Sequence, residues 1–340
     1  MISCLQKDNE KQYQEIHFSR LSDTRMVTGR PVHLKTDLIN PTHIGVIDSL
    51  LVILDIPNKV GSILLFNLNN DFSFLGATGK EGQGPGEYIG LTKIVTHGKF
   101  LYAFDITMST ITKISIDSVL SNPGYVPNER LRFSRPKIHN LAVIDTNNLI
   151  VGFYRENPRL RQVNQRGDSL HSFYNYLHLP NTYRVPEQSF LGNVRGNLLQ
   201  IRLAYNKRNQ LLAASYYNTA KIDLIDVKTR QVKKRIYGPD DTFPPQYVLT
   251  ESGRSALKED SKHSYLDLKF KKNNLYALYS GKTYKEGLIQ GDQLFVFDNE
   301  GTPIKKLSIN PGLFSFAVDE ERKKIYGVNF YDSPLYVYNF

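Results

Sequence analysis

The segment LYAFD at residues 101–105 decides the fold, because runs of the same kind return along the whole chain. Each run is short and rich in β-branched, leucine and aromatic residues, which is typical of a buried β-strand. The other runs are LVILD at 51–55, LIVGF at 149–153, LLAAS at 211–215, LYALY at 275–279 and IYGVN at 325–329. Their starts lie 50, 48, 62, 64 and 50 residues apart, and a period of this size predicts a repeat fold.

Each run belongs to a larger unit of about four strands. A β-like segment and a polar turn precede it, a third strand follows, and a more polar fourth strand closes most units. The third strand of the third unit, at 160–164, and the fourth strand of the second unit, at 131–133, have the weakest patterns. Six units of this kind predict an all-β, six-bladed β-propeller with four-stranded blades.

The sixth unit has only three strands before the chain ends at Phe340. Residues 32–36, ahead of the first unit, alternate as a strand does, and we expect them to supply the missing fourth strand. The ring would then be closed by an N-terminal strand, which removes two exposed sheet edges. We therefore expect one propeller domain at 16–340, preceded by a tether at 1–15.

The composition agrees with this fold class. Hydrophobic residues make up 40% of the 340 residues, and 21 Tyr and 18 Phe stand against no Trp, a balance that favours β-structure. The net charge of +10 is mildly basic, and no helix is offered to a nucleic-acid groove, so we expect no nucleic-acid partner. No run of 18 apolar residues is present to form a membrane-spanning helix.

The single cysteine, Cys4, excludes an internal disulfide framework and any zinc site built from several cysteines. It follows Ser3 and precedes a polar stretch at 6–12. This arrangement is similar to the end of a bacterial lipoprotein signal, although the charged and apolar regions that should precede the cysteine are missing. The sequence thus predicts lipidation of Cys4; a chance cysteine in a frayed terminus is the alternative.

A glycine-rich segment at 76–86 lies between the first and second units. It lacks the Lys-Ser/Thr pair of a phosphate-binding loop and the following helix of a dinucleotide fold, so we expect no nucleotide there. Pro85 and Gly86 suit the centre of a type II turn, Glu87 can accept backbone hydrogen bonds and Tyr88 can pack between blades. The predicted structural turn consists of Gly82, Gly84, Pro85, Gly86, Glu87 and Tyr88.

Residues 79–88, followed by the strand at 101–105, resemble an NHL-type repeat. More broadly, the chain resembles the bacterial TolB-like six-bladed propeller lipoproteins of unknown function, which carry this turn once, after the first blade. The resemblance is specific at 79–88 and architectural elsewhere. It implies a location in the cell envelope, periplasmic or at the surface, and a non-catalytic role.

Eight histidines are present, at 17, 33, 43, 97, 139, 171, 178 and 263, and none pairs with another at a metal-ligand spacing. A metal site assembled from several blades stays open as an alternative, and with it a lactonase-like, metal-dependent hydrolase or lyase at the central channel. The starts of the inner strands show no consistent acidic residue, so the resemblance to those enzymes is poor. We expect no cofactor and assign no catalytic residue.

Two features suggest a binding surface. The window 130–166 is rich in basic residues, so Arg155, Arg159 and Arg161 are candidates to bind an anionic or carbohydrate ligand; a solvated outer face is the alternative. Two long insertions, 175–197 and 238–264, should lie on the same face of the disc. They supply the further candidates Tyr183, Arg184, Arg195 and Tyr247, and a short helix is expected at 250–260. We therefore expect a non-enzymatic, envelope-anchored binding or scaffold module that uses its loop-rich face, with an envelope protein among the partners.

Overall fold

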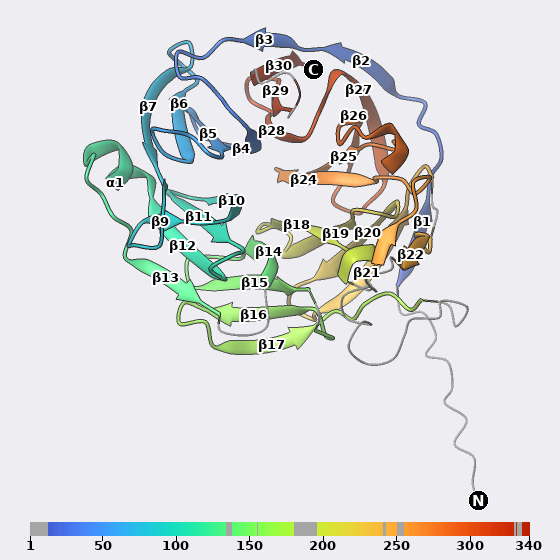
Figure 1. Cartoon of the computed structure of the whole chain (residues 1–340). Coiled ribbons are helices and arrows are strands. Elements are labelled where there is room, and N and C mark those ends of the chain that lie inside the picture. The colour runs from blue at the N-terminus through green and yellow to red at the C-terminus, as the bar shows by residue number, and fades with distance from the viewer. Residues whose placement is uncertain are drawn as a thin grey trace, which may run out of the picture.

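The computed structural model describes residues 13–133, 138–154, 156–179, 196–240, 243–249, 255–329, 331 and 335–340. Six sheets are arranged around a central axis as the blades of a propeller (Figure 1). The six-bladed, all-β prediction is therefore confirmed. Among the described residues, no helix has the length and apolar character needed to cross a membrane.

Each blade is an antiparallel sheet whose first strand is innermost. Blade 1 contains β4 (Pro41–Ile47), β5 (Leu50–Asp55), β6 (Ile63–Asn67) and β7 (Ser73–Thr78). Blade 2 contains β10 (Leu91–His97), β11 (Phe100–Asp105), β12 (Thr110–Ser115) and β13 (Glu129–Arg132). Blade 3 contains β14 (Ile138–Val143), β15 (Asn148–Phe153), β16 (Leu160–Asn164) and β17 (Ser169–Phe173).

The second half of the ring repeats this order. Blade 4 contains β18 (Ile201–Asn206), β19 (Leu211–Tyr216), β20 (Lys221–Asp226) and β21 (Gln231–Tyr237). Blade 5 contains β24 (Tyr265–Lys271), β25 (Asn274–Tyr279), β26 (Gly291–Phe297) and β27 (Pro303–Leu313). Blade 6 contains β28 (Ser315–Asp319), β29 (Lys324–Val328), β30 (Leu335–Asn339) and the N-terminal β3 (Arg30–Val32).

The N-terminal segment runs around the outside of half the ring (Figure 1). β1 (Gln14–His17) adds a parallel fifth strand to blade 4, and β2 (Thr24–Thr28) does the same for blade 5. β3 then pairs with β30, so that Val32 lies opposite Leu335. An N-terminal strand closes the ring, as expected, but β1 begins inside the segment expected to be a tether.

The position of the closing strand differs from the prediction. Residues 30–32 pair with blade 6, and of the predicted 32–36 only Val32 does so. The alternation at 32–36 reflects packing, because Val32 and Leu34 both lie against the core between blades 6 and 1. Pro31 is tolerated because β3 is an edge strand, where a missing N–H costs no ladder bond.

The core consists of layers between neighbouring blades. A cluster of buried apolar side chains fills each of the six junctions; Leu54 of blade 1, for example, packs with Leu91 of blade 2. Because the blades are covered on both sides, their second strands are continuously hydrophobic. This explains why the second strands carry the clearest sequence repeat.

The connections divide between two faces. The loop-rich face carries the connections from a second to a third strand and from a fourth strand to the next blade, and the hairpin face carries the others. On the loop-rich face lie β8 (Lys80–Glu81), β9 (Glu87–Tyr88), the hairpin of β22 (Tyr247–Leu249) and β23 (Ser255–Leu257), and the short 3₁₀ helix η1 (Tyr284–Glu286). The helix α1 (Ile116–Ser121) belongs to a hairpin-face connection.

The short helix expected at 250–260 is a wrong prediction. Residues 250–254 lie outside the described part of the chain, and residues 255–257 form β23, which pairs with β22. Phe243, Tyr247 and Leu257 of this insertion pack against the apolar cluster between blades 3 and 4. Tertiary packing of alternate side chains therefore favours a strand over the local helical tendency.

Candidate functional site: the channel and the loop-rich face

A ring of polar residues lines the central channel where the innermost strands begin. Each ring residue lies opposite the fifth residue of its neighbouring second strand, so the six positions are structurally equivalent. In order of blade they are His43, Lys93, Asn140, Arg202, Asp267 and Ser315. In blades 1, 2, 3 and 5 a break in the strand register directly precedes the ring residue. Such bulges re-aim side chains next to functional sites.

Hydrogen bonds join the ring residues across blade boundaries. The Lys93 ammonium lies 2.6 Å from Asn140 Oδ1, and the Asn140 amide donates to the carbonyl of Ile201 at 2.7 Å. Arg202 Nε donates to the carbonyl of Leu266 at 3.0 Å, and Ser315 Oγ donates to Asp267 Oδ2 at 2.7 Å. The ring thus locks blades 2 to 6 together at the axis.

The ring is unusually cationic for an enclosed site. Lys93, Arg202 and the adjacent Lys269 face one carboxylate, that of Asp267. Burial opposes ionisation of Asp267, but Lys269, 3.1 Å away, together with His43 and the Ser315 hydroxyl outweighs this effect and holds the aspartate pKa below its usual value. Burial, with a contribution from the nearby Lys269 and Arg202, lowers the pKa of Lys93 to about 7 although Asp267 acts in the opposite direction.

Two histidines beside these cations are held neutral. Burial, with a smaller contribution from the surrounding cations, lowers the pKa of both His43 and His139 to about 3; at His43 the Asp267 carboxylate opposes this shift. His43 Nδ1 and His139 Nε2 are buried without a hydrogen-bond partner. Within the described part of the chain, no group of three or more His, Cys, Asp or Glu side chains is placed to hold a metal ion.

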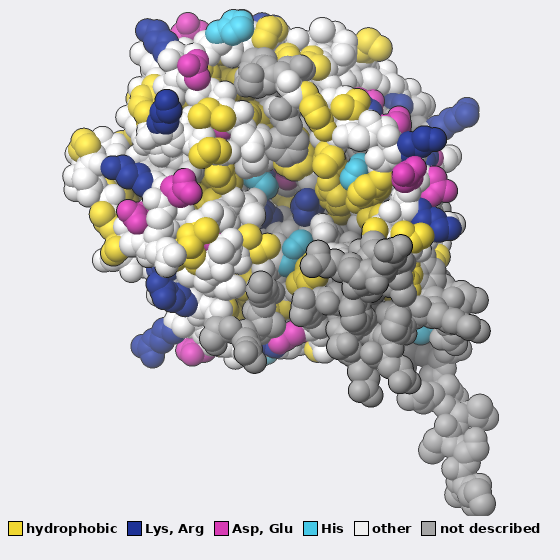
Figure 2. Space-filling model, viewed as in Figure 1, with side chains coloured by type: hydrophobic (Ala, Val, Ile, Leu, Met, Phe, Trp, Pro, Cys, Tyr) yellow, Lys and Arg dark blue, Asp and Glu magenta, His cyan; other side chains and the backbone are white. Residues whose placement is uncertain are grey.

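The loop-rich face carries exposed apolar side chains around the channel mouth. Six large hydrophobic residues on its connections are between 39% and 52% exposed: Ile39, Val60, Ile89, Val248, Leu288 and Tyr331. Figure 2 views this face, where hydrophobic side chains surround a central hollow that contains Lys or Arg and His. Exposed apolar groups that recur on one face are typical of an interaction surface.

The aromatic side chains on this face form a cluster beside the channel. His263 lies 5.3 Å from the ring centroid of Tyr217 and 3.9 Å from that of Tyr284. The Arg202 guanidinium lies 4.7 Å from the centre of the Tyr217 ring, which connects the cluster to the polar ring below. Tyr247, a predicted contact residue, is half-buried in β22.

The glycine-rich turn between blades 1 and 2 is a compact structural element. The N–H of Glu87 donates to the carbonyl of Gly84, which places Pro85 and Gly86 at the centre of the turn, and Gly86 has a φ of 74°. The Glu87 carboxylate accepts from the N–H of Gly84 at 2.9 Å. Gly82 has a φ of 148°, and a Cβ there would collide with that same carboxylate. Tyr88 is buried in the apolar cluster between blades 1 and 2.

The arginine-rich window does not form one free surface. Arg159 is only 1% exposed; its Nη2 donates to the carbonyl of Leu199 and its guanidinium lies over the Tyr176 ring. The expectation that Arg159 belongs to an exposed patch is therefore wrong, because the insertion after blade 3 covers it. Arg161 pairs with Glu156 and lies over the Phe153 ring.

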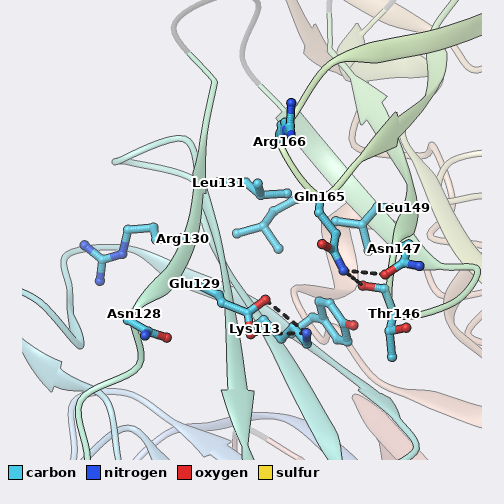
Figure 3. A pocket seen from close by; sticks show the side chains of 12 residues that line it. Lys113, Asn128, Glu129, Arg130, Leu131, Thr146, Asn147, Leu149, Gln165 and Arg166 are labelled. Carbon is cyan, nitrogen blue, oxygen red and sulfur yellow. Dashed lines mark hydrogen bonds and ion pairs between the residues drawn. The ribbon is translucent and has the colours of Figure 1, made fainter.

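Other arginines of the window lie beside a groove of about 370 Å³ between blades 2 and 3. Figure 3 shows Arg130 and Arg166 at its rim, pointing away from the central pair of Lys113 and Glu129, whose charged atoms are 3.0 Å apart. Arg130 instead donates to the carbonyl of Glu87 in the glycine-rich turn. Lys113 and Arg130 thus already have partners, so the described residues of the groove offer few cations to an anionic ligand.

Several candidate residues are not placed by the structure. Cys4, Arg155, Tyr183, Arg184 and Arg195 lie outside the described residues. Their assignments remain predictions.

The sequence analysis missed a buried polar network in blade 4. The carboxylate of Asp223 accepts from Arg235 at 2.6 and 2.9 Å and from the Tyr174 hydroxyl at 2.6 Å. The Tyr174 and Tyr216 hydroxyls are also 2.6 Å apart, and burial raises the pKa of both phenols, with Asp223 adding to the effect. In the sequence, Asp223 lies in the alternating segment KIDLID, at residues 221–226. This pattern is typical of many solvated strands and does not indicate a buried network.

The fold and the channel together define a single six-bladed propeller. The sequence matches the model of the family described as "TolB-like 6-blade propeller-like" over residues 22–321, and the chain belongs to this family. The chain is similar to a solved Bacteroides fragilis NCTC 9343 protein named "Putative exported protein", at 14% identity and a TM-score of 0.58, over 96% of this chain and 98% of the other.

A second similar structure is the β-propeller domain of Cps50 (Swd1) from Myceliophteria thermophila. It shares 11% identity with a TM-score of 0.50, over 92% of this chain and 99% of the other. At these identities both structures show the fold alone. Comparison of the sequence with curated proteins finds no match.

Proposed function

We propose that this protein is a non-enzymatic binding module of the bacterial cell envelope, which engages a protein partner through its loop-rich face. The observation that carries the proposal is the set of six exposed hydrophobic side chains on that face. They come from connections around blades 1, 2, 5 and 6, so a partner could contact most of the disc at once. Burial of apolar side chains is the main source of affinity in such contacts.

The opposite face offers less to a protein partner. On its connections, large hydrophobic side chains exposed in the described structure occur in blade 2, at Leu120 and Val126. The window of arginines supports an anionic ligand less well than expected, because Arg159 is buried and Arg161 is paired. We therefore favour a protein partner over an anionic or carbohydrate one on the loop-rich face.

The envelope location rests on two comparisons. The family match is to TolB-like propellers, and one similar structure is named as an exported protein. Lipidation of Cys4 would attach the propeller to a membrane through a tether that ends at β1. Metabolic labelling with a fatty-acid probe from the authentic start codon tests this; equal labelling of wild type and Cys4→Ser would contradict it.

The loop-rich face can be tested with matched surface variants. Val60→Ser with Ile89→Ser changes two side chains on this face that are 49% and 44% exposed. Leu170→Ser with Ile304→Ser is the control, since these side chains are 44% and 45% exposed on outer strands. Binding of a partner isolated from native envelopes is measured for both at low and high salt.

The loop-face pair should weaken binding by about tenfold or more, and the control pair should not. Salt should change the affinity little, because apolar burial is not screened. Equal loss in both pairs, or loss in the control pair alone, would show that the partner does not use this face.

A further inference from the structure

A cavity of about 260 Å³ lies next to the polar ring, on the side of the hairpin face. Its walls come from the innermost strands of blades 1, 2, 4, 5 and 6. Three lysines line it, Lys93, Lys269 and Lys271, and no carboxylate is among its described lining residues. The remaining lining is mostly apolar, with polar groups from Thr96 and Tyr205.

The strand geometry explains why the lysines meet here. Successive side chains of a strand point to opposite sides, so Asp267, Lys269 and Lys271 of β24 share one side. Asp267 belongs to the ring above and is held by Ser315 and by Lys269. Lys271 forms no ion pair within the described part of the chain, so its charge is available to a ligand.

Lys93 contributes charge more than hydrogen bonds. Its ammonium already donates to Asn140 Oδ1, to the carbonyl of Leu141 at 3.1 Å and to that of Leu203 at 3.3 Å. Three donors are all that a lysine has. A ligand below the ring would therefore receive hydrogen bonds from Lys269 and Lys271, and Coulomb attraction from Lys93.

We propose that this cavity is a binding site for a small dianionic group of the sulfate or phosphate type. Three lysine side chains that line one partly open cavity repel one another, and a bound anion reduces this repulsion. The volume suits a compact anion but lies below the range typical of larger organic ligands. The site lies on the opposite side of the ring from the loop-rich face. This proposal can therefore be tested independently of the proposed function.

The charge of Lys93 makes the site sensitive to pH. Lys93 is surrounded by His43 on β4, His139 on β14, Arg202 on β18, and Asp267 and Lys269 on β24. Both histidines, with pKa values near 3, stay neutral between pH 6 and 8. Lys93, with a pKa of about 7, is mostly charged at pH 6 and mostly neutral at pH 8. Anion affinity should therefore fall as the pH rises.

Titration calorimetry of the full chain with sodium sulfate, at constant ionic strength, tests the proposal; sulfate itself does not titrate between pH 6 and 8. We expect saturable binding of one sulfate at pH 6 and at least about fivefold weaker binding at pH 8. Lys271→Gln should weaken binding about tenfold. Lys272→Gln, an exposed neighbour with the same charge change, is the control and should bind as wild type does.

Lys93→Arg sharpens the test, because arginine stays charged at both pH values and should remove the pH dependence. Absence of saturable binding at pH 6, equal affinity of Lys271→Gln and wild type, or affinity that rises with pH would overturn the proposal. Comparison of free sulfate with glucose 6-sulfate separates two sources of the anion. Tighter binding of the ester indicates a group carried by a larger ligand, and tighter binding of the free ion indicates an inorganic anion.

Discussion

Blades 1 and 2 differ from blades 3 and 4 in how the connection at the end of the second strand is stabilised. At the end of the second strand, where the chain leaves the sheet on the loop-rich face, blades 1 and 2 carry Asp55 and Asp105. Each carboxylate accepts backbone N–H groups from the segment that enters the blade; Asp105, for example, binds those of Ile89 and Gly90. A short connection is thus held by charge-assisted hydrogen bonds.

Blades 3 and 4 have Phe153 and Tyr216 at the same position. An aromatic ring cannot accept several backbone hydrogen bonds, and these blades are instead covered by the long insertions. The polar partner is moved to the next strand, where Asp223 binds Arg235 and Tyr174. The comparison teaches that, of these four blades, the two without an aspartate at the end of the second strand have longer insertions. In these blades, buried arginines and hydrogen bonds between elements far apart in sequence stabilise the connections instead.

The largest expected effect is in blade 4. Asp223→Asn leaves the Arg235 guanidinium, which is 13% exposed, without its anionic partner. Breaking one side of a buried ion pair costs about 3–5 kcal/mol. Chemical denaturation should show this fall in the free energy of unfolding. Asp226→Asn, which breaks the pair with the exposed Lys233 on the same sheet, is the control and should cost about 1 kcal/mol or less. Equal costs would mean that the buried network does not stabilise blade 4.

A smaller loss of stability is expected when the Asp105 carboxylate of blade 2 is removed. Asp105→Ala removes the acceptor for three backbone N–H groups, those of Ile89, Gly90 and Met108. Their loss should cost about 2–3 kcal/mol. Thermal and denaturant melts measure it against Asp117→Ala, whose pair with Lys99 is exposed. If both variants melted alike, the carboxylate would not be what holds the entry to blade 2.

The pH dependence of stability should depend on the buried His139 of blade 3. The pKa of His139 is lowered to about 3, so the folded state favours the neutral ring and its stabilising contribution is complete above about pH 6.5. It is lost as the pH falls from 6.5 toward 3, by roughly 1–2 kcal/mol at pH 5.

His139→Gln should therefore flatten the stability profile between pH 7 and 5, measured by denaturation at each pH. His33→Gln, the same substitution at an exposed histidine, serves as the matched control. A slope equally steep in His139→Gln and wild type would show that folding does not lower the pKa of this histidine.

The smallest effect is expected at the rim of blade 3. Arg161→Gln breaks the half-exposed pair with Glu156 and loses contact with the Phe153 ring. Pairs of this kind contribute about 0.5 kcal/mol, and less as salt rises. Melts at low and high salt measure it. A loss above about 2 kcal/mol would place Arg161 in the buried network rather than at the surface.

The sequence predicted well what depends on short-range pattern. The second strands were correctly located, because their side chains face neighbouring blades on both sides. The weaker third strand of blade 3, at 160–164, was also correctly located. The added strands β1 and β2 were missed, since they pair with blades 4 and 5 from more than 200 residues away. Their sequences carry little apolar alternation of their own.

The candidate site was predicted less well. Arg159 looks in the sequence like its neighbours, and only the covering insertion makes it 1% exposed. The polar ring was missed for a different reason. His43, Lys93 and Asp267 share a position in the structure but no residue type, so no sequence repeat marks them.

The sequence by itself determined the number of blades, the order of their strands and the turn at 82–88. Strand periodicity and turn chemistry depend on residues close together in the chain, and they are repeated six times. Only the tertiary structure decided which side chains face the axis. Closing the ring brings six strands, about 270 residues apart at the extremes, to one channel, where Lys93, Lys269 and Lys271 line one cavity and Asp267 beside Lys269 supplies the neighbouring carboxylate. That charge balance is a property of the assembled ring, because no single blade contains it.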